Sequence, residues 1–95
     1  MRRRKTDGKV IEKARFITDA AHAEGEAEAR RFLAGLKEEH PFASHICYAF
    51  VSDRLGNLQR FSDDGEPQGT AGMPILENLK RCDLVLSALA VVRYF

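Results

Sequence analysis

The spacing of apolar residues in the first half of the chain predicts an amphipathic helix over residues 24–39. Four apolar residues recur at intervals of three and four, which places their side chains on one side of a helix. They are Ala29, Phe32, Leu33 and Leu36. Glutamates gather at the start of this segment, where the helix dipole favours acids. His40 is expected to end the helix, because a residue that precedes a proline avoids the α conformation.

Four other segments have the composition or the alternation of β-strands. Residues 10–18 mix apolar and polar side chains as a half-buried strand does, whereas residues 45–51 are rich in β-branched and aromatic residues. Residues 58–62 follow a stretch of turn-forming residues, so a hairpin is expected from residue 45 to residue 62. Residues 84–95 are almost continuously apolar, which is typical of a strand buried on both faces.

A second, shorter helix is expected where a loop rich in glycine and proline ends. Pro74 suits the first turn of a helix, in which its missing N–H is not needed. Ile75, Leu76 and Leu79 give this helix an apolar side. The predicted order is therefore β-α-β-β-α-β, an α/β fold of the two-layer α+β kind in a single domain over residues 9–95. Taken alone, this order favours a ferredoxin-like sandwich with right-handed crossovers.

Composition and charge limit the size of the fold and the kinds of partner. The 95 residues are too few for two cores, and 44% of them are hydrophobic, which suffices for one core. The net charge of +1 points to no class of partner. Residues 1–15, however, carry seven basic and two acidic residues, and the rest of the chain is net negative. Residues 1–8 are predicted to form a disordered basic leader.

A basic segment on a mildly acidic body is also a common arrangement for contact with phosphate groups. The candidate nucleic-acid contacts are Arg2, Arg3, Arg4, Lys5 and Arg15. A solvated chain end without a partner is the alternative interpretation.

Neither a signal peptide nor a membrane-spanning segment is visible in the sequence. The basic start is followed by polar residues, and no stretch of about 18 apolar residues occurs. Cys47 and Cys82 lie among apolar neighbours, and nothing requires them to form a disulfide. A cytoplasmic location is therefore expected.

Residues 61–76 carry a long motif, FSDDGEPQGTAGMPIL, that closely resembles the signature of the IMPACT/YigZ family. Shorter matches to the family are residues 14–17 (ARFI), residues 45–49 (HICYA) and residues 91–95 (VVRYF). They occur in the family's order and cover nearly the whole chain. The chain is accordingly identified as a member of the family, corresponding to its N-terminal domain.

The resemblance implies a fold and a role. The fold is that of the second domain of a small-subunit ribosomal protein, with a left-handed crossover and with residues 24–39 as an insertion. Eukaryotic relatives regulate translation under stress by interfering with activation of a kinase that phosphorylates an initiation factor. For bacterial relatives, the fold suggests nucleic-acid binding. The resemblance also implies a truncated member, because in the family a glycine-rich segment, a further helix and a second domain normally follow the stretch that matches residues 93–95.

Three carboxylates crowd into the loop before the second helix, at Asp63, Asp64 and Glu66 around Gly65. Crowded carboxylates repel one another unless a cation, backbone N–H groups or an arginine neutralises them. A Mg²⁺ ion is one solution, because it prefers carboxylate oxygen and water. Capping of turns and of the following helix is the other.

The small residues that follow could bring backbone N–H groups close to a phosphate, as loops before helices do. The neighbouring acids oppose an anion unless a cation bridges the two, and a tight loop with no ligand is the alternative. The predicted binding loop comprises Asp63, Asp64, Gly65, Glu66, Gly69, Thr70, Ala71 and Gly72.

Arg93 interrupts an apolar strand, so its charge must reach solvent or find a partner. We predict that it anchors the loop by pairing with one of the carboxylates of Asp63, Asp64 and Glu66. The neighbouring Tyr94 and Phe95 are expected to belong to the core rather than to a surface on which bases stack.

His45 and Cys47 would point the same way from a strand, as the two members of a catalytic pair do. Side chains two apart on a strand are roughly 6–7 Å apart, which is poor geometry for a nucleophile and its base. A packed thiol beside a hydrogen-bonded histidine is expected instead.

Three functions are compatible with these features, and a binding module is favoured. Such a module would act in translation by contacting RNA, the ribosome or a regulatory protein. The alternative is a Mg²⁺-dependent enzyme or nucleotide-binding protein that uses the loop of residues 63–72, but no acid–base pair or nucleophile is convincingly arranged. The third is homodimerisation or strand exchange through residues 84–95, because an apolar final strand is expected to expose apolar surface and an edge.

Overall fold

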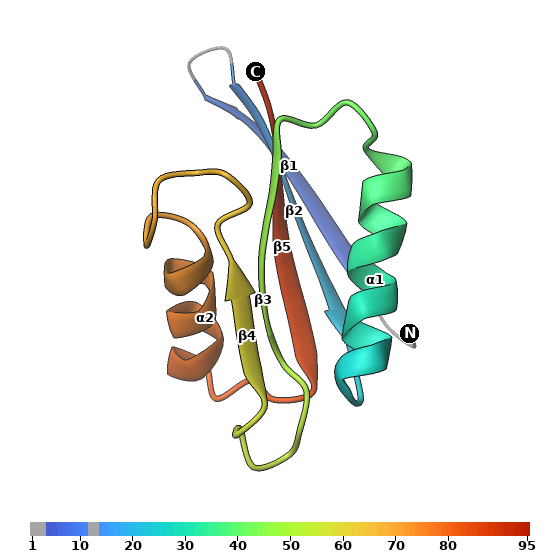
Figure 1. Cartoon of the computed structure of the whole chain (residues 1–95), viewed down its shortest axis with the longest axis vertical. Coiled ribbons are helices and arrows are strands. Elements are labelled where there is room, and N and C mark those ends of the chain that lie inside the picture. Colours follow the sequence, from blue (N-terminus) through green and yellow to red (C-terminus); the bar gives the residue numbers. More distant parts are fainter. Residues whose placement is uncertain (1–3, 12–13) are drawn as a thin grey trace.

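The computed structural model describes residues 4–11 and 14–95, which form a five-stranded sheet with two helices (Figure 1). The strands are β1 (Arg4–Ile11), β2 (Ala14–His22), β3 (His45–Val51), β4 (Gln59–Ser62) and β5 (Ser87–Tyr94). The helices are α1 (Glu26–Glu39) and α2 (Gly72–Arg81). The spatial order of the strands is β1-β2-β5-β3-β4, and every neighbouring pair is antiparallel.

The described part of the chain begins with a hairpin, which the sequence pattern did not predict. β1 pairs with β2 from Arg4 opposite Ala21 to Ile11 opposite Ala14. The expectation of a disordered leader is therefore wrong for residues 4–8, and the single strand expected over residues 10–18 is in fact parts of two strands. The side chains of residues 5–10 are all exposed, so β1 is held by backbone pairing and has no apolar alternation that could have revealed it.

The mixed α/β class is confirmed, with one strand more than expected, in the order β-β-α-β-β-α-β. The two-layer arrangement is wrong, because the helices cover opposite faces of the sheet (Figure 1). Successive side chains of a strand point to opposite faces. On β3, Ile46 and Phe50 pack with α1, whereas Cys47, Ala49 and Val51 pack with α2. The likeness to the ribosomal-protein fold and the left-handed crossover remain predictions.

Both helices bury the faces that their apolar spacing predicted. On α1 the buried side chains are Ala29, Phe32, Leu33 and Leu36. On α2 they include Ile75, Leu76 and Leu79, although the helix begins at Gly72, two residues before Pro74. None of the described helices is both long enough and apolar enough to cross a membrane.

β5 lies in the middle of the sheet, paired with β2 on one side and with β3 on the other. Its nearly continuous apolar sequence reflects contact with both layers, since Ala90 and Val92 pack with α1 while Leu89 and Val91 lie on the α2 side. A free edge on the final strand is therefore wrong, whereas homodimerisation or strand exchange through residues 84–95 remains a prediction. The edges of the sheet are β1 and β4.

One part of the sheet has less cover than the rest. α2 packs mainly on β3 and β4, and the α2 side of β2 and β5 is only half-buried. We call this surface the open strip; it consists of Phe16, Thr18, Ala20 and His22 of β2 with Leu89 and Val91 of β5. The opposite faces of the same strands are buried beneath α1. The open strip lies between α2 and the edge strand β1.

Candidate functional site

Asp63 closes the loop before α2 by accepting three backbone hydrogen bonds. The N–H groups donate from Gly69 at 2.9 Å, from Ala71 at 3.1 Å and from Gly72 at 2.7 Å. Gly72 is the first residue of α2, so the carboxylate satisfies N–H groups at the start of that helix, which have no partner within it. The bonds from Gly69, Gly72 and Ala71 hold the pKa of the Asp63 carboxyl below its ordinary value.

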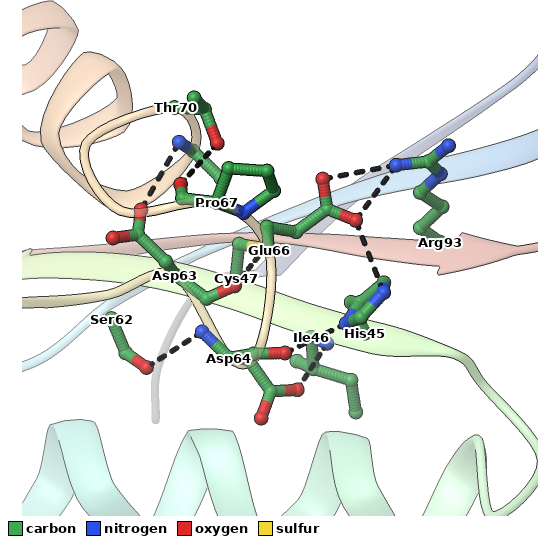
Figure 2. Close-up of polar contacts among 11 residues, drawn as sticks. His45, Ile46, Cys47, Ser62, Asp63, Asp64, Glu66, Pro67, Thr70 and Arg93 are labelled. Atoms are coloured by element: carbon green, nitrogen blue, oxygen red, sulfur yellow. Dashed lines mark hydrogen bonds and ion pairs between the residues drawn. The ribbon is translucent and has the colours of Figure 1, made fainter.

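Asp64 ties the loop to the beginning of β3 (Figure 2). Its carboxylate accepts from the Ile46 N–H at 2.6 Å, and its carbonyl oxygen accepts from His45 Nδ1 at 2.7 Å. Asp64 and Gly65 both have positive φ, 46° and 87°. These two left-handed residues reverse the chain, which directs Glu66 back toward the sheet.

Glu66 completes the anchoring of the loop. Arg93 Nη1 lies 2.7 Å and 2.9 Å from the two carboxylate oxygens of Glu66, and His45 Nε2 lies 3.2 Å from one of them (Figure 2). The predicted arginine–carboxylate pair is therefore present, and Glu66 is the partner among the three candidates. With its side chain only 15% exposed, Glu66 joins the loop to β3 and β5 at once.

All three loop carboxylates are thus engaged by groups of the chain itself. The N–H groups that were candidates for phosphate contact donate to Asp63, and the Thr70 hydroxyl donates to the Pro67 carbonyl oxygen. Within residues 4–11 and 14–95, no group of three or more His, Cys, Asp or Glu is placed to hold a metal ion. The geometry therefore favours the capping interpretation over a Mg²⁺ or phosphate site in the loop.

Cys47 lacks the properties of a nucleophile. Its Sγ donates to the Asp63 carbonyl oxygen at 3.1 Å. Burial, followed by the negative charges of Glu66, Asp64 and Asp63, raises the pKa of the thiol to about 11. A thiol that stays protonated near neutral pH is a poor nucleophile, and His45 is turned toward Asp64 and Glu66 instead. The packed thiol expected from the sequence matches this arrangement.

The predicted nucleic-acid contacts do not form one surface. Arg2 and Arg3 lie outside the described residues, and of Arg4 only the backbone is described. Lys5 is opposite Ala20 and therefore on the side of the open strip. Arg15 lies on the α1 side, with its guanidinium 5.5 Å from the ring centre of Tyr94.

The strand register reveals a row of residues that sequence reasoning missed. Lys9 is opposite Phe16, Phe16 is opposite Arg93, and Arg93 is opposite His45. Directly opposed residues share a face, so the row crosses four strands on the α2 side. The Arg93 guanidinium lies 5.6 Å from the ring centre of Phe16 and 4.3 Å from that of Phe95. Only the pairing of β1 with β2, of β2 with β5 and of β5 with β3 brings these residues together.

Two hollows lie along the open strip. The larger, of about 630 Å³, is at the end nearest Lys5, and its lining includes Ala20, His22, Leu79, Leu84 and Leu89. The smaller, of about 230 Å³, is at the other end, beside the loop. It is lined by Phe16, Cys47, Glu66, Thr70, Ala71, Ile75, Val91 and Arg93.

The two final residues differ in burial. Tyr94 packs against the core on the α1 side, and its hydroxyl lies 2.5 Å from His40 Nδ1. Phe95 is 76% exposed, so its expected place in the core is wrong. Its ring lies instead against the Arg93 guanidinium, beside the row that contains Phe16.

Comparison with known proteins identifies relatives for almost the whole described chain. The family model described as "Impact N-terminal domain" matches residues 12–95. "IMPACT family member YvyE" of Bacillus subtilis (strain 168) is 44% identical over 86 residues, which cover 90% of this chain and 40% of that protein. An "IMPACT family member" of Haemophilus influenzae is 49% identical over 87 residues, covering 90% and 42%. "IMPACT family member YigZ" of Escherichia coli (strain K12) is 44% identical, covering 90% and 43%.

A solved structure has the same fold. It is described as "Crystal structure of an hypothetical protein", has a TM-score of 0.92 and is 40% identical in sequence. The match covers 97% of this chain and 46% of that one. The chain therefore spans less than half the length of these relatives.

Proposed function

The chain belongs to the IMPACT family, since the family's N-terminal domain model matches residues 12–95, and from this we propose that it is a non-catalytic binding module that acts in translation or its regulation under stress. The proposed partner is RNA, either free or within the ribosome. The proposed regulatory role also includes contact with proteins that regulate translation. The proposal places the module in the cytoplasm, where a reducing environment suits the free thiols of Cys47 and Cys82.

The observation that carries the proposal is the open strip with its basic border. Lys5 and Lys9 are exposed on β1 and lie opposite Ala20 and Phe16 of the strip. A half-buried sheet surface with an aromatic ring and flanking lysines is the arrangement on which single-stranded nucleic acids stack their bases and place their phosphates. Asp7 lies between the two lysines on the same face. The border therefore carries a basic residue at each end and an acidic residue in the middle.

The absence of reactive geometry in the described site supports a binding role over catalysis. The Cys47 thiol is held protonated, and the carboxylates of Asp63 and Glu66 are occupied by backbone N–H groups and by Arg93. A general acid or base must be able to reach a substrate proton. Cys47 and Glu66 instead line the smaller hollow of the strip, and Asp63 holds the adjoining loop in shape.

Reversing the charges at the basic border and measuring RNA binding tests the proposal. We expect the double variant Lys5→Glu/Lys9→Glu to bind a short, fluorescein-labelled single-stranded RNA at least about 10-fold more weakly than the unaltered protein at about 50 mM salt. The slope of log affinity against log salt should fall by about 1.4, because each phosphate contact to a single strand contributes about 0.7. Fluorescence anisotropy at several salt concentrations measures both.

The matched control reverses two charges on the far side of the sheet. Arg31→Glu/Lys37→Glu changes the net charge by the same amount at exposed positions of α1, which covers the other face. We expect this variant to keep the salt slope of the unaltered protein and most of its affinity. An affinity that does not depend on salt, or equal losses in the two variants, would refute RNA binding at the strip.

A further inference from the structure

The smaller hollow of the open strip has a lining suited to one planar ring. We propose that it accepts a single unpaired base of a single-stranded RNA, an inference that rests on the proposed function and names the part of the RNA that is recognised. At about 230 Å³ the hollow is below the roughly 300–1,000 Å³ of pockets that enclose whole drug-sized ligands. One ring fits that space better than a complete nucleotide.

The walls of the hollow combine apolar and polar groups in the way that base recognition needs. Phe16, Ile75 and Val91 supply apolar and aromatic surface on the sheet and on α2. Stacking on an aromatic ring is tolerant of sequence, because every base has a π face. Thr70 and Arg93 add polar groups to the lining, to which the edge of a base would turn.

Arg93 supplies the second, independent observation. Among the buried side-chain nitrogen and oxygen atoms of the described residues, Arg93 Nε is the one without a hydrogen-bond partner. Buried donors without an acceptor are rare and costly. Glu66 holds Nη1 of the same guanidinium, so the group has a fixed orientation while the N–H of Nε has no acceptor. Because Nε is covered in the unbound protein, an acceptor on the edge of a bound base satisfies it once the side chains that cover it move aside.

The charges around the hollow favour a base over a phosphate as its occupant. Glu66 also lines the hollow, and its carboxylate already binds the Arg93 guanidinium at 2.7 Å and 2.9 Å. A phosphate would have to displace this carboxylate and would be repelled by it. Lys9, directly opposite Phe16 on the edge strand, is placed outside the hollow, where the backbone of the same nucleotide would lie.

The larger hollow offers no comparable site. Apart from Lys5, His22 and Ser87, its lining consists of alanine and leucine side chains. None of its lining residues carries a buried side-chain nitrogen or oxygen without a partner, within the described residues. The recognition of a base edge is therefore assigned to the Phe16 end of the strip.

The test combines a variant of the protein with a change in the RNA. Phe16→Leu keeps apolar bulk on the sheet but removes the ring, and we expect it to weaken RNA binding about 10-fold without changing the salt slope. Replacing single nucleotides of the RNA by abasic ones should weaken binding to the unaltered protein at one position only. That abasic RNA should bind the Phe16→Leu variant no more weakly than intact RNA does, because the contact is already lost.

The control is Phe42→Leu, which changes an aromatic ring that is 88% exposed in the loop between α1 and β3, away from the hollow. Salt-dependent RNA binding that is unaffected by Phe16→Leu and by every abasic substitution would overturn the base pocket and leave the proposed function standing. Absence of salt-dependent RNA binding to the unaltered protein would overturn both. The abasic series on the unaltered protein keeps the test decisive if the variant folds poorly.

Discussion

Asp63 shows how one side chain holds the loop before α2 in shape. Its carboxylate lies at the start of α2, where a ligand would otherwise bind. There it accepts hydrogen bonds from the N–H groups of three residues. The glycines and small residues that suggested a phosphate site are there because the backbone wraps closely around this carboxylate. The same residues thus shape the loop, and the surface proposed for recognition lies beside them on the sheet.

The lowered pKa of Asp63 predicts a specific pH dependence of stability. The folded protein binds the Asp63 proton less tightly than the unfolded chain, whose ordinary pKa is about 3.9. The stabilisation is therefore fully present above that value and is lost as the pH falls through the lower, folded value. Asp63→Asn should be less stable than the unaltered protein at pH 7, and this difference should shrink below pH about 4. Urea unfolding followed across the acid range checks this, and parallel stability curves would contradict it.

Arg93 marks the limit of prediction at the scale of residues. A lone charge in an apolar strand needs a partner, so a pair with a loop carboxylate could be predicted. Which carboxylate depends on the left-handed turn at Asp64 and Gly65, which turns Glu66 toward β5. The stacking of Arg93 between Phe16 and Phe95 depends on strand register and could not be predicted.

At the scale of elements, α2 is placed by a close approach of its first residue to the end of β4. A Cβ atom added at Gly72 would lie 2.7 Å from the carbonyl carbon and oxygen of Ser62, both backbone atoms that cannot move aside. Gly72→Ala should therefore destabilise the fold by about 1–3 kcal/mol. Thermal or urea unfolding measures this change.

Gly35 is the matched control for that substitution. It lies within α1, and an added Cβ would meet nothing within 4 Å. Gly35→Ala should stabilise the protein by about 0.5–1 kcal/mol, because alanine loses less backbone entropy than glycine in a helix. If both substitutions stabilised the protein, the close contact between α2 and β4 would be wrong.

The elements also differ in how well sequence predicts them. α1 and α2 were predicted because their apolar residues repeat with the helical period. β1 was not, because its side chains from Lys5 to Val10 are exposed and carry no pattern of burial. An edge strand held by backbone pairing to one neighbour leaves little trace in its own sequence.

For the whole molecule, the three-layer arrangement predicts two separate cores. Leu36 is buried on the α1 side and Leu79 on the α2 side, with the sheet between them. Replacing either Leu36 or Leu79 with alanine should destabilise the protein by about 2–5 kcal/mol. Because the two sites share no packing partners, the double variant should equal the sum of the single ones within about 0.5 kcal/mol. Urea unfolding gives all three values, and a large departure from additivity would show that the two cores are coupled.

The open strip is the surface that both of the proposed associations, with RNA and with a second copy of the chain, would use. A homodimer through residues 84–95 is still a proposal, and with β5 in the centre of the sheet it would have to use the Leu89 and Val91 side of that strand. Such a dimer would cover the surface proposed for RNA. Light scattering with and without RNA distinguishes the two uses of the strip.

The order of residues along the chain by itself determined the two helices, the β3–β4 hairpin, the final apolar strand and membership in a family, because these depend on local periodicity and on contiguous motifs. Only the tertiary structure decided that the helices cover opposite faces, that β5 is central, and that Lys9, Phe16, Arg93 and His45 form one row. Those features depend on which strands pair and in what register. Pairing joins residues far apart in the chain through backbone groups that are the same in nearly every residue, so the local pattern of side chains does not specify it.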